Sequence, residues 1–275
     1  MKVLYVSDLD GTLLDRADRL PDWTVNTLNR LVREGMLFTY ATARSLSSAS
    51  VVTSGLQLQL PVIVYNGAFL MDPASRRVIS AAAFSPAFRE EMRGFLRGQP
   101  LPILVYSLLD GAERVSWILG RENEAVRHYL DSRLDDPRLR GVRSEEELFA
   151  GEIFYYTFLG EREELAAVRD RFSGREDCNC IFQRELYREE YWCEIMPPEA
   201  SKASGILRLK NLLGADRVVS FGDAANDIPM FQVSDECYAV GSAIPELCAL
   251  ANGVLPPSGE SGVAKWLEAR WRQEG

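Results

Sequence analysis

The order of hydrophobic and polar residues divides the chain into two kinds of sequence. Short apolar runs that end in polar residues or glycine predict buried strands, and near the start of the chain they cover 2–9, 37–41 and 62–65. Between the first two runs, apolar residues at helical spacing predict a helix over 22–34, which Gly35 ends. A further helix is expected to run to about residue 58. Strands that alternate with helices across short connections predict a parallel α/β sheet.

The same pattern returns near the end of the chain, where a helix, a strand, a helix and two short strands are expected over 201–213, 217–221, 228–233, 238–240 and 253–255. The middle of the chain differs. Its helices are expected over 86–97, 122–134, 145–149 and 163–172. Its strands are expected over 101–109, 114–118, 152–159, 178–186 and 189–195, the last two forming a hairpin that turns at Tyr187-Arg188.

Strands that follow one another without a helix between them pair antiparallel, so the middle of the chain is expected to be an α+β domain inserted into the α/β one. The Pro- and Ser-containing segments near 72–75 and 196–198 are natural boundaries. We therefore expect one domain made of 1–82 and 197–275, and a second made of 83–196.

Composition then narrows the class of protein. The chain has 275 residues, 47% of them hydrophobic, and a formal net charge of −9, which disfavours nucleic-acid binding. No stretch approaches the ~18 uncharged apolar residues of a membrane-spanning helix, and Asp8 interrupts the apolar run that a signal peptide would continue. An odd number of cysteines, five, favours free thiols in a reducing compartment. We expect a soluble cytoplasmic protein without a nucleic-acid or membrane partner, and its oligomeric state stays open.

Polar residues gather where the expected core strands end. In an open parallel sheet, ligands bind outside the carboxyl ends of the strands. These ends carry Asp8-Leu9-Asp10-Gly11-Thr12, Ala41-Thr42-Ala43-Arg44, Asn66-Gly67 and Gly222-Asp223-Ala224-Ala225-Asn226-Asp227. Asp8, Asp10 and Asp223 in one crevice would repel each other unless a cation lay between them. Because the chain has a single histidine and these ligands are oxygens, the cation expected is Mg²⁺.

The four motifs of the haloacid-dehalogenase-like phosphatases are similar in residue type and order to Asp8-Leu9-Asp10-Gly11-Thr12, Thr42, Lys202 after Ser201, and Gly222-Asp223-Ala224-Ala225-Asn226-Asp227. The long insert between the second and third motifs is similar to the large α+β (type IIB) cap of the Cof-type subgroup. The resemblance spans essentially the whole chain. It implies a Rossmann-like catalytic core over 1–82 and 197–275, and a cap over 83–196 that selects the substrate.

The resemblance also implies residue roles. Asp8 would be the nucleophile that forms an aspartyl-phosphate, and Asp10 the general acid and base. Thr42 and Lys202 would stabilise the transferring phosphoryl group. Mg²⁺ would be held by Asp8, by the carbonyl of Asp10 and by Asp223. Asn226 and Asp227 would orient the cation and its waters, and Arg44 and Asn66 would contact the substrate.

The predicted activity is a Mg²⁺-dependent phosphomonoester hydrolase for small phosphorylated metabolites, with sugar phosphates as the first expectation from the resemblance. Alternatives remain open within the superfamily. One is a phosphotransferase or phosphomutase, and another is a hydrolase narrow for a glycosyl-phosphoglycerate or a disaccharide phosphate. A non-catalytic protein that binds phosphorylated metabolites is disfavoured, because binding alone requires neither a nucleophile nor an acid.

Overall fold

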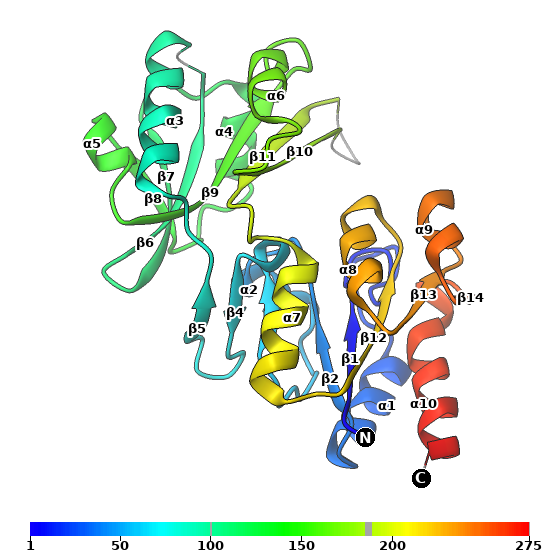
Figure 1. Cartoon of the computed structure of the whole chain (residues 1–275). Helices are drawn as coiled ribbons and strands as arrows, with labels where there is room; N and C mark the ends of the chain where they lie inside the picture. The colour runs from blue at the N-terminus through cyan, green and yellow to red at the C-terminus, as the bar shows by residue number, and fades with distance from the viewer. Residues whose placement is uncertain (100, 185–188, 275) are drawn as a thin grey trace. The chain divides into compact units, whose positions relative to one another are not determined.

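The computed structural model of the chain describes residues 1–99, 101–184 and 189–274 (Figure 1). It divides into two compact units, which we call the core unit (Met1–Ala81 with Glu199–Gly275) and the inserted unit (Ala82–Pro198). These boundaries lie within two residues of those expected from the sequence. None of the described helices is both long and apolar enough to cross a membrane.

The core unit is built on a five-stranded parallel sheet in the order β14-β13-β12-β1-β2. Its strands are β1 (Val3–Ser7), β2 (Leu37–Tyr40), β12 (Arg217–Gly222), β13 (Glu236–Val240) and β14 (Gly253–Leu255). The predicted parallel sheet is confirmed, and the order places β1 between β2 and β12. The residues that follow these three strands therefore meet at one edge of the sheet.

Helices cover both faces of this sheet (Figure 1). Side chains alternate along β1, so that Leu4 and Val6 join a cluster with Ile206 and Leu209, whereas Tyr5 lies edge-on to Trp266 on the other side. The first face carries α7 (Lys202–Leu213), α8 (Ile228–Val233) and α9 (Pro245–Leu250). The second carries α1 (Asp22–Arg33) and α10 (Gly262–Glu274), and α2 (Leu46–Val52) follows β2. Of the two core helices that the sequence analysis did not expect, α9 and α10, the second follows a 3₁₀ turn, η3 (Ser258–Glu260).

A second, three-stranded antiparallel sheet extends the core unit. It consists of β3 (Val62–Val64), β4 (Phe69–Met71) and β5 (Val78–Ala81), with the 3₁₀ turn η1 (Tyr65–Gly67) between the first two. An isolated parallel bridge between Ala41 and Ile63 joins it to the end of β2. The sequence analysis did not expect β4 and β5, because strands of three and four residues are too short to show a clear alternation of apolar and polar positions.

The inserted unit has a six-stranded sheet in the order β10-β11-β9-β6-β7-β8, antiparallel except for β7 beside β8. The strands are β6 (Leu104–Leu109), β7 (Ala112–Ile118), β8 (Leu139–Val142), β9 (Glu152–Gly160), β10 (Asn179–Arg184) and β11 (Tyr191–Met196). The helices are α3 (Pro86–Gly98), α4 (Glu124–Asp131), α5 (Glu145–Leu148) and α6 (Ala166–Phe172). The predicted hairpin pairs as β10 and β11, while its turn at Tyr187-Arg188 lies outside the described residues.

Apolar packing in the inserted unit centres on one face of its sheet. Val105, Tyr156 and Ile195 lie side by side on three neighbouring strands, and Phe88 and Phe172 cover them from α3 and α6. Two of its helices begin at serine caps: Ser85 accepts from the backbone of α3, and Ser144 forms a capping box with Glu147 at the start of α5. This unit has a hydrophobic cluster of its own, as an independent domain requires.

The close approach of the turn η1 to the start of α7 can be tested by substitution. Gly67 has φ +93°, and a Cβ added there would lie 1.9 Å from the carbonyl oxygen of Ser201, the residue before α7. We expect Gly67→Ala to lower the free energy of unfolding by about 2–4 kcal/mol, since it combines backbone strain with a clash against backbone. The measurement is the urea midpoint of unfolding.

Gly94→Ala is the matched control. Gly94 lies inside α3, and an added Cβ there meets nothing within 4 Å. The same substitution should raise stability by about 0.5–1 kcal/mol, because alanine loses less backbone entropy in a helix. A neutral Gly67→Ala variant would contradict the close approach of η1 to the start of α7.

Candidate active site

The predicted site residues follow neighbouring strands of the core sheet. Asp8 comes directly after β1, and its backbone N–H donates to the carbonyl of Phe221 in β12 over 2.9 Å. Asp223 comes directly after β12. On the other side of β1, Thr42 follows β2 and is fully buried. The parallel order β12-β1-β2 thus brings three chain segments far apart in sequence to one edge of the sheet.

A buried lysine joins two of the carboxylates. The Nζ of Lys202 donates to Oδ1 of Asp8 over 2.5 Å and to Oδ1 of Asp227 over 2.7 Å. The side chains of Lys202, Asp8 and Asp227 are 1%, 6% and 0% exposed. Burial alone would lower the pKa of Lys202, but the charges of Asp227 and Asp8 raise it above its ordinary value. The lysine therefore remains an ammonium ion inside the protein, where it balances part of the acidic charge.

Local structure explains how the lysine is held between the two carboxylates. Lys202 is the first residue of α7, and the side chain of Ser201 caps that helix by accepting from the backbone of Ser204. Asp227 uses its second carboxylate oxygen to accept from the N–H groups of Asp223 and Ala224, over 2.9 and 3.0 Å. The Asp227 end of the Asp8–Lys202–Asp227 bridge is thereby fixed to backbone, and this holds the loop after β12 in shape.

The carboxylates form a cluster suited to a divalent cation. One oxygen each from Asp8, Asp223 and Asp227 lies within 4.8 Å of the others. Burial raises the pKa of Asp8 well above its ordinary value, although the Lys202 charge opposes this. Burial also raises the pKa of Asp223 to about 6, against the hydrogen bond that Thr12 donates to it over 2.7 Å. One lysine does not neutralise three carboxylates, and hard oxygen ligands fit Mg²⁺ or a similar cation.

Gly11 allows this cluster to form. It has φ +80°, and a Cβ there would lie 2.3 Å from Oδ2 of Asp223. Both the turn and the closeness of the Asp223 carboxylate therefore favour a glycine at this position of the first motif.

Asp10 lies differently from the expectation that it would point with Asp8 into one crevice. The strand ends at Ser7, so Asp10 belongs to a turn, and its side chain is 43% exposed. Arg44 binds both of its carboxylate oxygens, with Nε at 2.9 and 3.0 Å and Nη2 at 2.5 Å. Arg44 also contacts Asp18 at 3.3 Å. The carboxylate that completes the acidic cluster is Asp227, not Asp10.

The remaining predicted residues lie around this arrangement. Asn226 of the fourth motif donates to the side-chain oxygen of Asn66 over 3.2 Å, which joins that motif to the turn η1. Asn66 is buried, with a left-handed backbone at φ 51°. Thr42 accepts from the backbone N–H of Arg44 over 3.1 Å. The structure places each of these residues near the motifs, and their roles toward a substrate stay predictions.

Sequence reasoning missed Arg208. Arg208 lies on α7, after Lys202. It donates to the carbonyl of Gly67 and, over 3.0 Å, to the hydroxyl of Ser80. It thus ties η1 and β5 to the helix that carries Lys202. No sequence signal distinguishes this arginine from the many arginines on exposed surfaces, because its partners are a backbone carbonyl and a serine.

Comparison with known proteins places this geometry in a family. The family profile described as haloacid dehalogenase-like hydrolase matches residues 5–267. A 5-amino-6-(5-phospho-D-ribitylamino)uracil phosphatase, YitU of Bacillus subtilis, is 25% identical over 96% of each chain. An HMP-PP phosphatase of Cronobacter sakazakii is 24% identical over 90% of this chain and 88% of its own.

Solved structures share the fold. TM0651 from Thermotoga maritima superposes with a TM-score of 0.78, at 22% identity over 98% of this chain and 97% of its own. The HAD subclass IIB sugar phosphatase BT4131 superposes with a TM-score of 0.73, at 22% identity over 98% of both chains. The chain belongs to the haloacid dehalogenase-like hydrolases. The predicted α/β fold with an inserted α+β domain, the Cof-type resemblance and the enzyme class, a hydrolase with phosphatases as relatives, are confirmed.

The raised pKa of Asp223 predicts how cation binding depends on pH. With a folded-state pKa of about 6 against an ordinary 3.8, the cation-free fold loses stability as pH rises from about 4 to about 6. A divalent cation needs the ionised form, and about a tenth of Asp223 is ionised one pH unit below its pKa. We expect Mg²⁺ to raise the melting temperature more at pH 7.5 than at pH 5, with about tenfold weaker apparent binding at pH 5.

Differential scanning fluorimetry across a Mg²⁺ titration measures this. Asp223→Asn should lose the Mg²⁺-dependent shift at both pH values. Asp131→Asn, an exposed aspartate of the inserted unit, should keep it. An equal Mg²⁺ shift at the two pH values in the native chain would contradict the assignment.

Proposed function

We propose that the protein is a Mg²⁺-dependent phosphomonoester hydrolase that acts through an aspartyl-phosphate on Asp8. The observation that supports this most is the Asp8–Lys202–Asp227 bridge. One oxygen of Asp8 is held by the ammonium at 2.5 Å, which fixes the carboxylate at the end of a rigid strand. A binding protein would have no need of such a carboxylate, whereas a nucleophile needs a defined position.

In the first step, a carboxylate oxygen of Asp8 attacks the phosphorus of the monoester in line. The new bond joins that oxygen to phosphorus, and the bond between phosphorus and the ester oxygen breaks. Lys202 and the hydroxyl of Thr42 are the groups proposed to stabilise the charge on the phosphoryl oxygens. The leaving alkoxide takes a proton from Asp10 and departs as the alcohol.

In the second step, Asp10 takes a proton from water while the water oxygen attacks the phosphorus of the aspartyl-phosphate. The bond to the Asp8 oxygen breaks, so that inorganic phosphate leaves and the carboxylate is regenerated. Arg44 binds Asp10 in the structure and is itself proposed to contact the substrate. A substrate phosphate that competes for Arg44 would release Asp10 for its work as acid and base.

The residues that would hold the cation are Asp8 and Asp223, with the backbone carbonyl of Asp10. When bound, the cation offsets negative charge so that a carboxylate can approach a phosphate. Asp227, which is occupied by Lys202 and two backbone N–H groups, keeps the loop that carries Asp223 in place. Asn226 is proposed to orient groups around the cation.

The proposed substrate class is small phosphorylated metabolites, with sugar phosphates as the first candidates. Support comes from relatives named for a phosphoribitylamino-uracil and for HMP-PP, and from a fold shared with a sugar phosphatase. We assign the chemistry to the core unit and the choice of substrate to the inserted unit, Ala82–Pro198. We also infer that the protein works in the cytoplasm, on a soluble substrate.

Phosphate release from a panel of sugar phosphates, nucleotides and cofactor phosphates tests the reaction class. We expect release with Mg²⁺, its loss with EDTA, and recovery when excess Mg²⁺ is added back, because the acidic cluster needs a counter-charge. Release that persists in EDTA would contradict the metal dependence. Isomerisation of a sugar phosphate without phosphate release would favour a phosphomutase instead.

Asp8→Asn tests the nucleophile. The amide cannot attack phosphorus, so we expect kcat to fall by about a thousandfold or more and no acid-labile phosphoprotein to form. The fold should persist with a lower free energy of unfolding, because the amide oxygen of asparagine can still accept from Lys202 and Asp227 still pairs with it. Asp131→Asn, which removes an exposed carboxylate far from the motifs in sequence, is the matched control. Native-like turnover in folded Asp8→Asn would exclude the covalent mechanism.

A further inference from the structure

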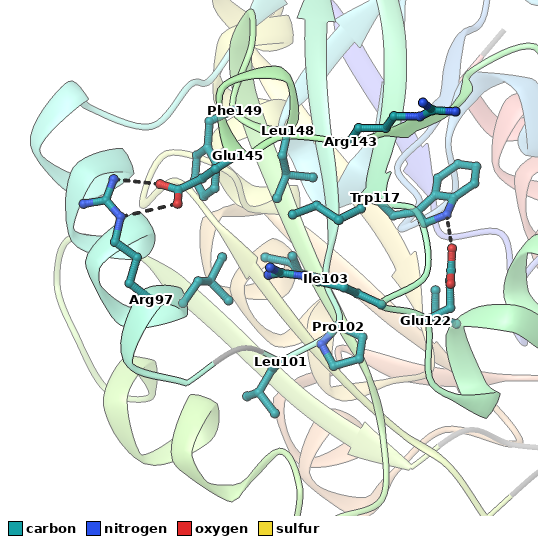
Figure 2. A pocket seen from close by; sticks show the side chains of 14 residues that line it. Arg97, Leu101, Pro102, Ile103, Trp117, Glu122, Arg143, Glu145, Leu148 and Phe149 are labelled. Atoms are coloured by element: carbon teal, nitrogen blue, oxygen red, sulfur yellow. Dashed lines mark hydrogen bonds and ion pairs between the residues drawn. The ribbon is translucent and has the colours of Figure 1, made fainter.

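A cavity of about 280 Å³ lies within the inserted unit, and it shares no residue with the acidic cluster (Figure 2). Small-molecule sites in proteins have volumes of about 300–1,000 Å³, so this one suits a ligand with one or two fused rings. None of its lining residues takes part in the reaction proposed above.

The walls of the cavity are mostly apolar. They come from α3, from the segment before β6, from the end of β7, and from α4 and α5. Ile103, Val126, Leu148 and Phe149 are buried, whereas Leu101 at the edge is half-buried. A ring placed among these side chains would exchange water contact for apolar contact, which is the main favourable contribution to binding.

Two hydrogen-bonded side-chain pairs lie at opposite sides of the cavity in Figure 2. On one side, Arg97 of α3 donates to Glu145 of α5 over 2.8 Å. On the other, the indole N–H of Trp117 donates to Glu122 over 2.8 Å, and the same oxygen accepts from the backbone of Gly120. The first pair joins α3 to α5, and the second joins the end of β7 to the segment before α4, so each links two parts of the cavity lining.

Two arginines at the cavity have no acidic partner. The guanidinium groups of Arg121 and Arg143 form no hydrogen bond or ion pair with any residue in the described part of the chain, and both side chains are exposed. Arg97 is paired with Glu145 and also contacts Glu90, which does not line the cavity, at 3.6 Å. The other charged residues of the lining are two guanidinium groups and the carboxylate of Glu122, which already accepts two hydrogen bonds. This balance favours an anion.

We propose that this cavity is a binding site for a small amphipathic anion, an apolar ring that carries one carboxylate or phosphate. The ring packs among Ile103, Val126 and Phe149, and the anionic group lies at the rim with Arg121 and Arg143. The site is separate from the acidic cluster of the core unit. Binding there does not depend on the reaction proposed for Asp8.

Indole-3-acetate is the probe, with indole-3-acetamide as the neutral analogue of the same shape. By calorimetric titration we expect the acetate to bind with a Kd on the order of 0.1–1 mM, as ligands of this size do in a partly open pocket. The acetamide should bind about fivefold more weakly or worse, since it loses the charge interaction with the arginines. Equal affinity for the two compounds, or no saturable binding, would overturn the proposal.

Variants then locate the site. The double variant Arg121→Gln with Arg143→Gln should bind indole-3-acetate about fivefold more weakly and bind indole-3-acetamide as the native chain does. Leu101→Trp, which fills the cavity from its half-buried edge, should abolish binding of both compounds. Arg162→Gln, an exposed arginine of the same unit without an acidic partner, is the matched control and should bind as the native chain does. Full binding in the double variant or in Leu101→Trp would overturn the proposal.

A last comparison separates this inference from the proposed function. Binding of indole-3-acetate should persist in the Asp8→Asn variant and in the presence of EDTA, because neither change alters a residue of the cavity. Binding that disappears in both would place the ligand at the acidic cluster and overturn the inference. Loss of phosphate release with binding intact would count against the proposed catalysis alone.

Discussion

The structure depends on one buried ammonium ion. Lys202 lies between Asp8 and Asp227 where there is almost no water, and removing one partner of such a bridge typically costs about 3–5 kcal/mol. The lysine can occupy this place only if α7 begins beside the ends of β1 and β12. Three features accompany this position of the lysine: β1 and β12 are neighbours, and Ser201 caps α7. Residue 67 is a glycine because η1 lies against the start of the same helix.

The same site lowers the stability of the fold. Burial raises the pKa of Asp8 and of Asp223, which means that their charged forms are destabilised where they lie. Lys202 compensates for only part of this. A divalent cation would compensate for the rest, so the unfavourable energy stored in the cluster becomes affinity for the cation. A fold optimised for stability alone would have apolar side chains here, and retained carboxylates mark a functional region.

Sequence reasoning succeeded where a short segment determines the outcome. The apolar run before Asp8 predicts a buried strand, and parallel order then places Asp8, Thr42 and Asp223 at one edge. It did less well where side chains choose among several partners. Asp227 binds Lys202 and backbone, Asp10 binds Arg44, and neither choice can be derived from spacing. The cavity of the inserted unit depends on packing among four separate elements, which no local pattern encodes.

The insertion itself has a consequence for the newly made protein as it leaves the ribosome. The inserted unit is one continuous stretch, Ala82–Pro198, whereas the core unit is interrupted and Lys202 lies 194 residues after Asp8. While the chain grows from its N-terminus, β1 lacks its neighbour β12, and the nucleophile proposed here lacks its counter-charge. The inserted unit can fold first, because its contacts are complete earlier. A truncated product would therefore contain the acidic motif of β1 without any assembled catalytic centre.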